Sequence, residues 1–348
     1  MSTTSTRKRL AALAGAAVAG TAILAVSGLV ASAAGLDLNN GTSTPFHLAK
    51  VGPVNQLDGL PDADPLHDAS ANGFPYWYSD GTDALALCLD KPDGAVDNCA
   101  LAGTLPDPDA PITFPQVTDG PGNFPDEAFY WMATGGGDIG TGANAGRSLV
   151  VMALEAAFAS EIAQPGDQMV FARTRLRIDI PVDGQYTVVW PYGKKDFAAT
   201  AGRRTINVTQ DVGITAGQFT DALAGNIGPF LRWDASAPAA PEGFLGDAGT
   251  LHGVTGSPFV YGGRAANFFR IEGPVGAQLR TADGANPCPD RPTATNCVEY
   301  PQFTVLGKLA ARKGVEGTRA TYTRHGATTN IDLFGYSAPG AHLQAGAE

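Results

Sequence analysis

The sequence predicts a mainly β protein, an antiparallel β-sandwich or jelly-roll-like fold with immunoglobulin-like elements and few short helices. Its 44 glycines and 25 prolines in 348 residues are typical of many short strands joined by tight turns. Stretches of alternating apolar and polar residues recur between such turns, whereas only residues 216–224 predict a helix, and a short one. Short strands in succession favour antiparallel sheets over a parallel α/β sheet.

The N-terminal third predicts loops with one hairpin. Residues 36–72 are punctuated by prolines and lack a sustained period, so we expect extended loop there. Residues 74–78 and 84–89 are apolar or aromatic, and the run Ser-Asp-Gly-Thr-Asp between them has the composition of a turn. This arrangement predicts a hairpin.

The next segment alternates between loop and strand. Residues 94–123 return to a loop rich in Pro and Asp, and residues 127–133 predict a strand that ends in a flexible glycine-rich run over 135–142. Residues 148–160 suit a buried strand or a short buried helix, and we favour the strand.

Residues 168–180 give the clearest strand signal in the chain. One face is apolar apart from a threonine and comprises Val170, Ala172, Thr174, Leu176, Ile178 and Ile180. A turn at 181–184 leads to residues 185–190, which predicts an antiparallel hairpin. Tyr186 in this second arm has the sequence context of the tyrosine corner of immunoglobulin-like sandwiches, in which the hydroxyl bonds the nearby backbone.

Further short strands are expected in the remainder of the chain, at 204–209, 229–233, 267–271, 302–306, 318–322 and 329–334. The run Asp-Ala-Ser-Ala-Pro-Ala-Ala-Pro at 234–241 resembles a linker. We therefore predict an acidic segment with a β-sandwich domain over 34–233 and a C-terminal β region over 242–348, which can also belong to the same domain.

The first 33 residues predict a secretory signal peptide. Arg7, Lys8 and Arg9 precede an apolar stretch over 10–30 and the small-residue site Ala-Ser-Ala at 31–33. An uncleaved anchor is the alternative, because 21 largely apolar residues just span a bilayer. We favour cleavage, since the stretch is rich in Ala and Gly rather than Leu. The expected product is secreted or extracellular, with the cell surface as a second location and without stable membrane insertion.

Four cysteines fit that oxidising compartment. Cys88 and Cys99 are close in sequence, as are Cys288 and Cys297, and four cysteines allow three connectivities. We favour the two local bridges, because each closes a short loop rich in turn-forming residues. The spacings are too wide for a zinc knuckle.

Acidic residues are concentrated near the N-terminus of the predicted mature chain. Residues 36–130 contain fourteen Asp and one Glu against two Lys, in a protein with a formal net charge of −11. Such a field disfavours nucleic acid and anionic membranes and favours hard cations. A calcium site is one hypothesis, with solvated turn residues as the alternative; its candidate ligands are Asp80, Asp83, Asp90, Asp93 and Asp97.

Two further clusters suggest binding surfaces. Tyr76, Trp77 and Tyr78 could form a platform that stacks on sugar rings, although strand alternation would bury some of these rings and core packing is favoured. Arg173, Arg175 and Arg177 form a stripe on one face of their strand. The stripe could hold a polyanion, but we favour ion pairs within the protein or solvation.

Motifs for catalysis are absent from the sequence. It contains no G-x-S-x-G, no H-E-x-x-H and no P-loop, and its five histidines are scattered. Glu155 and Glu272 could have raised pKa values if buried, but each is better interpreted as a strand residue paired with an arginine. A glycosidase with two separated carboxylates leaves little local signature and stays as an alternative.

Several runs along the predicted mature chain resemble a family of uncharacterised secreted bacterial proteins, some of which carry added immunoglobulin-like modules. The runs are residues 72–80, 87–90, 153–158, 166–168, 171–173, 186–193, 228–233, 255–258, 269–274 and 307–308. The resemblance implies secretion and a domain-sized unit and carries over no catalytic residue.

These observations together predict a secreted or cell-surface β-sandwich protein of binding or structural type. We expect a monomer, with calcium as a possible stabilising ion and a carbohydrate or a cell-envelope component as the partner. A secreted hydrolase that acts on polysaccharide is the alternative.

Overall fold

The computed structural model describes residues 46–57, 70–94, 96–115, 122–311, 315–326, 328–337 and 341–347. Within these ranges the protein is mainly β, as predicted, and its sheets are antiparallel. The helical elements among the described residues are two short 3₁₀ helices, η1 (Gly142–Asn144) and η2 (Asp221–Ala224). The predicted signal peptide, residues 1–33, lies outside the described residues.

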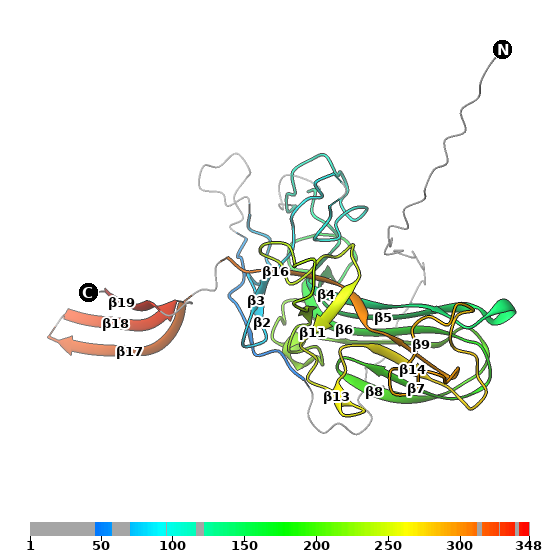
Figure 1. The fold of residues 1–348 in the computed structure, drawn as a ribbon. Coiled ribbons are helices and arrows are strands. Elements are labelled where there is room, and N and C mark those ends of the chain that lie inside the picture. The colour runs from blue at the N-terminus through cyan, green and yellow to red at the C-terminus, as the bar shows by residue number, and fades with distance from the viewer. Residues whose placement is uncertain are drawn as a thin grey trace, which may run out of the picture. The chain divides into compact units, whose positions relative to one another are not determined.

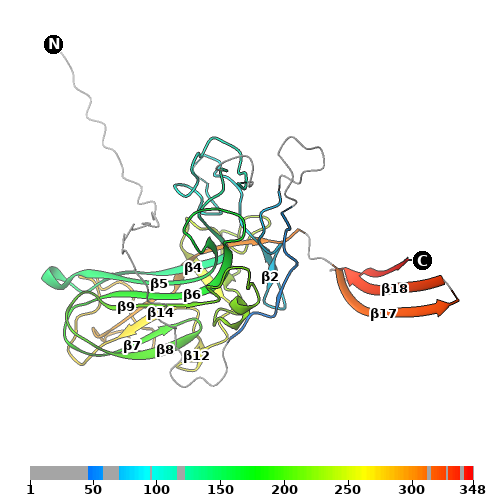
Figure 2. The same ribbon diagram turned by 180° about the vertical axis from the view of Figure 1, so that it is seen from behind.

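Two antiparallel sheets form a sandwich, seen from opposite sides in Figures 1 and 2. The larger sheet has the order β1 (Lys50–Val51), β2 (Tyr78–Ser79), β3 (Ala84–Ala86), β16 (Gln302–Leu309), β4 (Glu127–Ile139), β5 (Gly146–Phe158), β6 (Gln168–Ile180) and β9 (Gly202–Val212), with β10 (Arg232–Trp233) and β11 (His252–Thr255) joined to β16. The smaller sheet has the order β15 (Cys297–Tyr300), β14 (Phe269–Glu272), β7 (Gly184–Trp190) and β8 (Gly193–Ala199).

Two smaller elements complete the described strands. β12 (Val260–Tyr261) and β13 (Arg264–Ala265) form a short hairpin. β17 (Val315–His325), β18 (Thr328–Ser337) and β19 (Ala341–Ala347) form a three-stranded meander.

The main core lies between the two sheets. The apolar face of β6 supplies Val170, Leu176 and Ile178, each fully buried, and the smaller sheet supplies Val188 and Ile271 from the other side. Strand alternation turns every second residue of β6 toward this core and leaves the arginines on the outer face. The predicted strand over 168–180 is thus confirmed, as is the strand interpretation of 148–160.

The chain crosses from one sheet to the other between β6 and β7. We predicted a hairpin between these strands, and this was wrong: β6 pairs with β5 and β9, whereas β7 pairs with β8 and β14. The tyrosine-corner hydrogen bond is present at this crossing, because the Tyr186 hydroxyl donates to the Val182 carbonyl at 2.6 Å. The short turn therefore serves as a corner of the sandwich rather than as a hairpin loop.

The predicted flexible run over 135–142 is also wrong in its first half, because β4 continues to Ile139. Glycine is required in this strand because aromatic rings lie against its backbone. A Cβ at Gly135 would lie 2.5 Å from the Phe303 ring, and a Cβ at Gly137 would lie 2.8 Å from the Tyr300 ring. The glycines leave room for packing instead of adding mobility.

Three other predictions need correction. Residues 216–224 form only η2 and turns, and Gly217 has a φ of 73° that an α-helix does not allow. Seven of the described strands were missed, namely β1, β8, β11, β12, β13, β15 and β19. Residues 234–241 do not separate two sheets, because β10 before this segment pairs with β11 after it, and β16 lies between β3 and β4.

Candidate functional site

The outer face of the larger sheet carries a row of side chains that the antiparallel register sets side by side across five strands. In this row Thr304 pairs with Thr134, Thr134 with Val151, Val151 with Arg175, and Arg175 with Thr209. Thr209 is exposed and the other four residues are partly exposed. Arg177 lies one step along β6, between Leu149 and Asn207. We call these eight residues, including Arg175 and Arg177, the arginine face.

Arg173 lies at one end of the stripe and is fully paired. Its guanidinium contacts the carboxylates of Glu155 at 2.8 Å and Asp211 at 2.7 Å, and Glu127 lies 3.8 Å away. It also lies over the Phe171 ring. The prediction of ion pairs within the protein is therefore confirmed for Arg173, and so is the pairing of Glu155 with an arginine.

Arg175 and Arg177 differ from Arg173, because neither has a carboxylate partner among the described residues. The Nε atom of Arg175 donates to the Thr209 hydroxyl at 3.2 Å, and the Nε atom of Arg177 is buried without a hydrogen-bond partner. A buried donor without a partner costs about 1–3 kcal/mol. Asp179, the next residue on this face of β6, instead accepts hydrogen bonds from the backbone amides of Arg147 and Arg204.

The electrostatics of the arginine face reflect this imbalance. Burial, together with the neighbouring guanidinium groups of Arg173 and Arg177, lowers the pKa of Arg175. Arginine remains charged at any physiological pH. Alternate residues of a strand are about 6.7 Å apart, so Arg175 and Arg177 present two positive groups at that spacing. The face can therefore hold an anion or a chain of regularly spaced anions.

Glu155 makes the group of carboxylates around Arg173 sensitive to pH. Its side chain is buried, and burial together with the hydrogen bond and charge of Glu127 raises its pKa further than Arg173 lowers it. An acid with a raised pKa in the folded state contributes stability that is fully present below its unfolded pKa, about 4.3, and is lost as the pH rises through the folded value.

We therefore expect Glu155→Gln to gain stability relative to the wild type as the pH rises above about 4.3, by up to about 1.4 kcal/mol per pH unit. Urea unfolding of both proteins between pH 4 and pH 9 measures this difference. Glu242→Gln, at an exposed position, is the matched control for the loss of one carboxylate. A constant difference for Glu155→Gln would contradict the assignment.

The carboxylates of four of the five aspartates of the calcium hypothesis contact groups of the protein. Asp80 accepts hydrogen bonds from the amides of Thr82, Asp83 and Phe230, and Asp97 accepts from Leu101 and Ala102. Two others form ion pairs, Asp83 with Arg232 and Asp90 with Lys308, while Asp93 forms a backbone bridge with Val96. Within the described ranges, no three His, Cys, Asp or Glu side chains are grouped to hold a metal ion.

The three rings of the predicted platform do not share a surface. Tyr78 is buried, and its hydroxyl donates to the Phe219 carbonyl at 2.7 Å. Tyr76 is 40% exposed, and Trp77 packs over Gly52. The expected alternation fails because strand β2 contains only Tyr78 and Ser79. Core packing accounts for the buried rings of this segment.

A shallow pocket of about 460 Å³ contains two carboxylates and bears on the hydrolase alternative. It is lined by Asp138, Thr281, Asp283 and Asn286 among others. The Thr281 hydroxyl and the Ala285 amide lower the pKa of Asp283, which therefore stays ionised at neutral pH. An ionised carboxylate cannot supply the proton that glycoside cleavage requires, so Asp283 cannot act as the general acid of a glycosidase.

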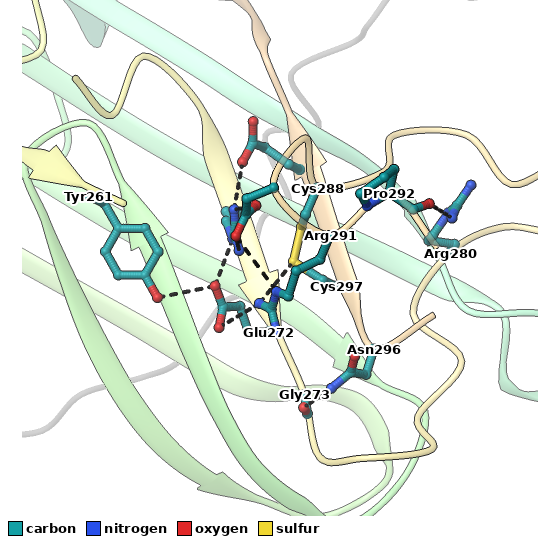
Figure 3. The surroundings of a disulfide bond; sticks show 12 residues. Tyr261, Glu272, Gly273, Arg280, Cys288, Arg291, Pro292, Asn296 and Cys297 are labelled. Atoms are coloured by element: carbon teal, nitrogen blue, oxygen red, sulfur yellow. Dashed lines mark hydrogen bonds and ion pairs between the residues drawn. A yellow bond between two sulfur atoms is a disulfide. The ribbon is translucent and has the colours of Figure 1, made fainter. Parts of the chain in front are cut away.

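Both predicted disulfides are present, Cys88–Cys99 and Cys288–Cys297. The second lies beside a group of charged side chains, shown in Figure 3, that we call the ionic network. At its centre, the buried Arg270 contacts Glu272 at 2.7 Å, Asp290 at 2.6 Å and Glu299 at 3.3 Å. Arg264 binds both oxygens of Glu299, Arg291 contacts Glu272 at 2.8 Å, and the Tyr261 hydroxyl donates to Glu272.

The ionic network is balanced, with three guanidinium groups against three carboxylates, and every charged member has a partner. It joins β14 and β15 to the β12–β13 hairpin and to the loop that the disulfide closes. The pairing of Glu272 with arginine was predicted, but the network as a whole was not, because its members come from separate segments. Because every charged member of the ionic network is already paired, we assign the network a structural role.

The chain was compared with known protein families, with curated proteins and with solved structures, and none of these comparisons gave a match. The family resemblance therefore stays a prediction. No helix in the described part of the chain has the length and apolar character that crossing a membrane would require.

Proposed function

We propose that this chain is a secreted or cell-surface binding protein that holds an anionic polysaccharide on the arginine face. The observation that carries the proposal is the contrast within the stripe. Arg173 has three carboxylates within 3.8 Å, whereas Arg175 and Arg177 have none among the described residues. An arginine pair of this kind gains charge-assisted hydrogen bonds when an anion binds.

A polysaccharide suits the surface that surrounds the two arginines. Thr134, Thr304 and Thr209 offer hydroxyl groups in the row of Arg175, and Asn207 offers an amide beside Arg177. These groups can exchange hydrogen bonds with sugar hydroxyls, while Arg175 and Arg177 recognise acidic substituents. The net charge of −11 opposes any polyanion, so binding depends on the hydroxyl and amide contacts as well as on the two arginines.

Two observations support an extracellular location. All four cysteines form disulfides, which persist in oxidising compartments and are rare in reducing ones. The N-terminal sequence has the three parts of a cleavable signal. Together they favour a ligand of the cell envelope or of the surroundings of the cell.

The test is isothermal titration calorimetry of the full chain with oligomers of polygalacturonate, with dextran sulfate and with neutral dextran, in EDTA. We expect binding to one or both acidic polymers, no binding to dextran, and weaker binding at higher salt. The double variant Arg175→Gln/Arg177→Gln should raise Kd by roughly a hundredfold, because two charge-assisted contacts are lost.

The matched control is Lys194→Gln/Arg319→Gln, which removes the same charge from two other sheets and should leave Kd unchanged within about twofold. Preference for polygalacturonate over dextran sulfate would identify carboxylate as the recognised group, and the reverse preference would identify sulfate. Equal binding of dextran and the acidic polymers, or equal losses in the two double variants, would reject the proposal.

A further inference from the structure

Arginines without a partner gather on two neighbouring strands of the larger sheet. Within residues 122–311, most arginines contact a carboxylate, and Arg280 donates to two backbone carbonyls. Four arginines have neither kind of partner among the described residues, namely Arg175 and Arg177 on β6 and Arg203 and Arg204 on β9. β6 and β9 are paired. Arg203 and Arg204 therefore extend the set of unpaired arginines beyond the arginine face.

Arg203 and Arg204 lie in a β-bulge, and we call them the bulge arginines. Ile178 and Ile180, two apart on β6, pair with residues four apart on β9, so residues 203–205 lie opposite one residue of β6. Both arginines are exposed. Arg204 has a φ of 49°, in the left-handed region that glycine and asparagine adopt with less strain. The backbone of the bulge therefore does not explain why arginine is present at this position.

The acidic side chains beside the bulge bind backbone amides instead of guanidinium groups. Asp179 accepts hydrogen bonds from the amides of Arg147 and Arg204 at 2.9 Å and 2.7 Å. Asp183 accepts a hydrogen bond from the Ala201 amide at 2.7 Å. These contacts fix the backbone on both sides of the bulge, and β-bulges often direct side chains toward a binding site.

The two ends of the arginine face differ in charge. At Arg173, the carboxylates of Glu127, Glu155 and Asp211 lie within 3.8 Å of one guanidinium group. An anionic chain that extended past Arg173 would be repelled by these carboxylates, whereas the other end offers the two bulge arginines. The bulge lies four residues, about 13 Å, beyond Arg175 along β6. An anionic chain is therefore favoured along β6 from Arg175 toward the bulge.

We propose that the bulge arginines form a second contact for the anionic polysaccharide, so that the protein binds an extended chain rather than a short unit of it. This inference rests on the proposed function, because it takes Arg175 and Arg177 as the first contact. Two acidic substituents satisfy that pair, and further substituents on the same chain reach the bulge arginines. Guanidinium groups form paired hydrogen bonds with carboxylates and similar anions. Linked contacts of this kind make the affinity depend on chain length.

The test is fluorescence anisotropy of labelled octagalacturonate with the full chain in EDTA, with unlabelled digalacturonate as a competitor. The variant Arg203→Gln/Arg204→Gln should raise the Kd for octagalacturonate at least tenfold, because two charge-assisted contacts are lost. Its Kd for digalacturonate should stay within about twofold of the wild-type value, since Arg175 and Arg177 are retained. Long and short size fractions of dextran sulfate replace the two oligomers if the protein binds dextran sulfate and not polygalacturonate.

Two further variants separate charge from structure. Arg203→Lys/Arg204→Lys keeps both charges and should retain most of the affinity for octagalacturonate, whereas Lys194→Gln/Arg319→Gln removes the same charge elsewhere and should leave Kd unchanged. If Arg203→Gln/Arg204→Gln weakens the binding of both oligomers equally, the bulge supports the fold of the arginine face and the inference is overturned.

The same assay distinguishes the failure of this inference from the failure of the proposed function. If the wild type binds neither acidic polymer, or if Arg175→Gln/Arg177→Gln leaves Kd unchanged, the proposed function is rejected together with this inference. If Arg175→Gln/Arg177→Gln weakens binding while Arg203→Gln/Arg204→Gln matches the wild type with both oligomers, only this inference is rejected.

Discussion

Replacing Arg270 with glutamine is expected to lower the free energy of unfolding by about 3–5 kcal/mol, the usual cost of breaking a buried ion pair. Arg270 is 3% exposed and contacts three carboxylates, one of which, Glu299, is 2% exposed. Glutamine cannot reach all three groups or neutralise them, so Glu299 would retain only its contact with Arg264. Urea unfolding at pH 7 measures the loss.

The control for Arg270→Gln is Arg264→Gln, because Arg264 also binds Glu299 but is 43% exposed. Its loss should be smaller, since solvent screens an exposed ion pair. The hydrogen bond from Arg270 is also the main reason that the pKa of Asp290 is lowered to about 2. In Arg270→Gln this pKa should rise toward the ordinary value of about 3.9. Equal losses for the two variants would contradict a network centred on Arg270.

Removing the disulfide Cys288–Cys297 by a double serine substitution is expected to cost about 2.7 kcal/mol on the chain-entropy model. The two cysteines are nine residues apart, and their loop carries Asp290 and Arg291, both members of the ionic network. Freeing the loop also loosens these two contacts. The losses from this variant and from Arg270→Gln should therefore sum to more than the loss measured when both changes are combined.

The control is the other disulfide, Cys88–Cys99, whose cysteines are eleven residues apart and whose removal should cost about 2.8 kcal/mol. Its loop makes no hydrogen bond or ion pair with the ionic network among the described residues. Its loss should add to that of Arg270→Gln within about 0.5 kcal/mol. If removal of either disulfide gave a loss that simply adds to the loss from Arg270→Gln, the disulfide Cys288–Cys297 would not support the ionic network.

The parts of the fold that were predicted from the sequence depend on local patterns. The six alternating residues on the core face of β6 were sufficient to identify the strand, and short turn-rich loops were sufficient to pair the cysteines. The Tyr186 hydrogen bond spans only four residues and was also predicted. Local sequence did not indicate that the same corner moves the chain to the other sheet, because that depends on which strands lie beside β7.

The missed features depend on residues distant in sequence. Gly135 and Gly137 look like flexible positions until Phe303 and Tyr300 are placed against them. The arginine stripe was visible in the sequence, but its division into a paired Arg173 and two unpaired arginines required Asp211 from β9 and Glu155 from β5. The ionic network likewise joins segments between residues 261 and 299 that carry no common motif.

A crystal structure of the protein with a polygalacturonate oligomer would test the central claim most directly. The account predicts an oligomer lying across β5, β6 and β9, with carboxylates in contact with the guanidinium groups of Arg175 and Arg177 and with the Nε atom of Arg177 paired. An oligomer bound elsewhere, with both arginines unchanged, would contradict the assignment of the arginine face as the binding site.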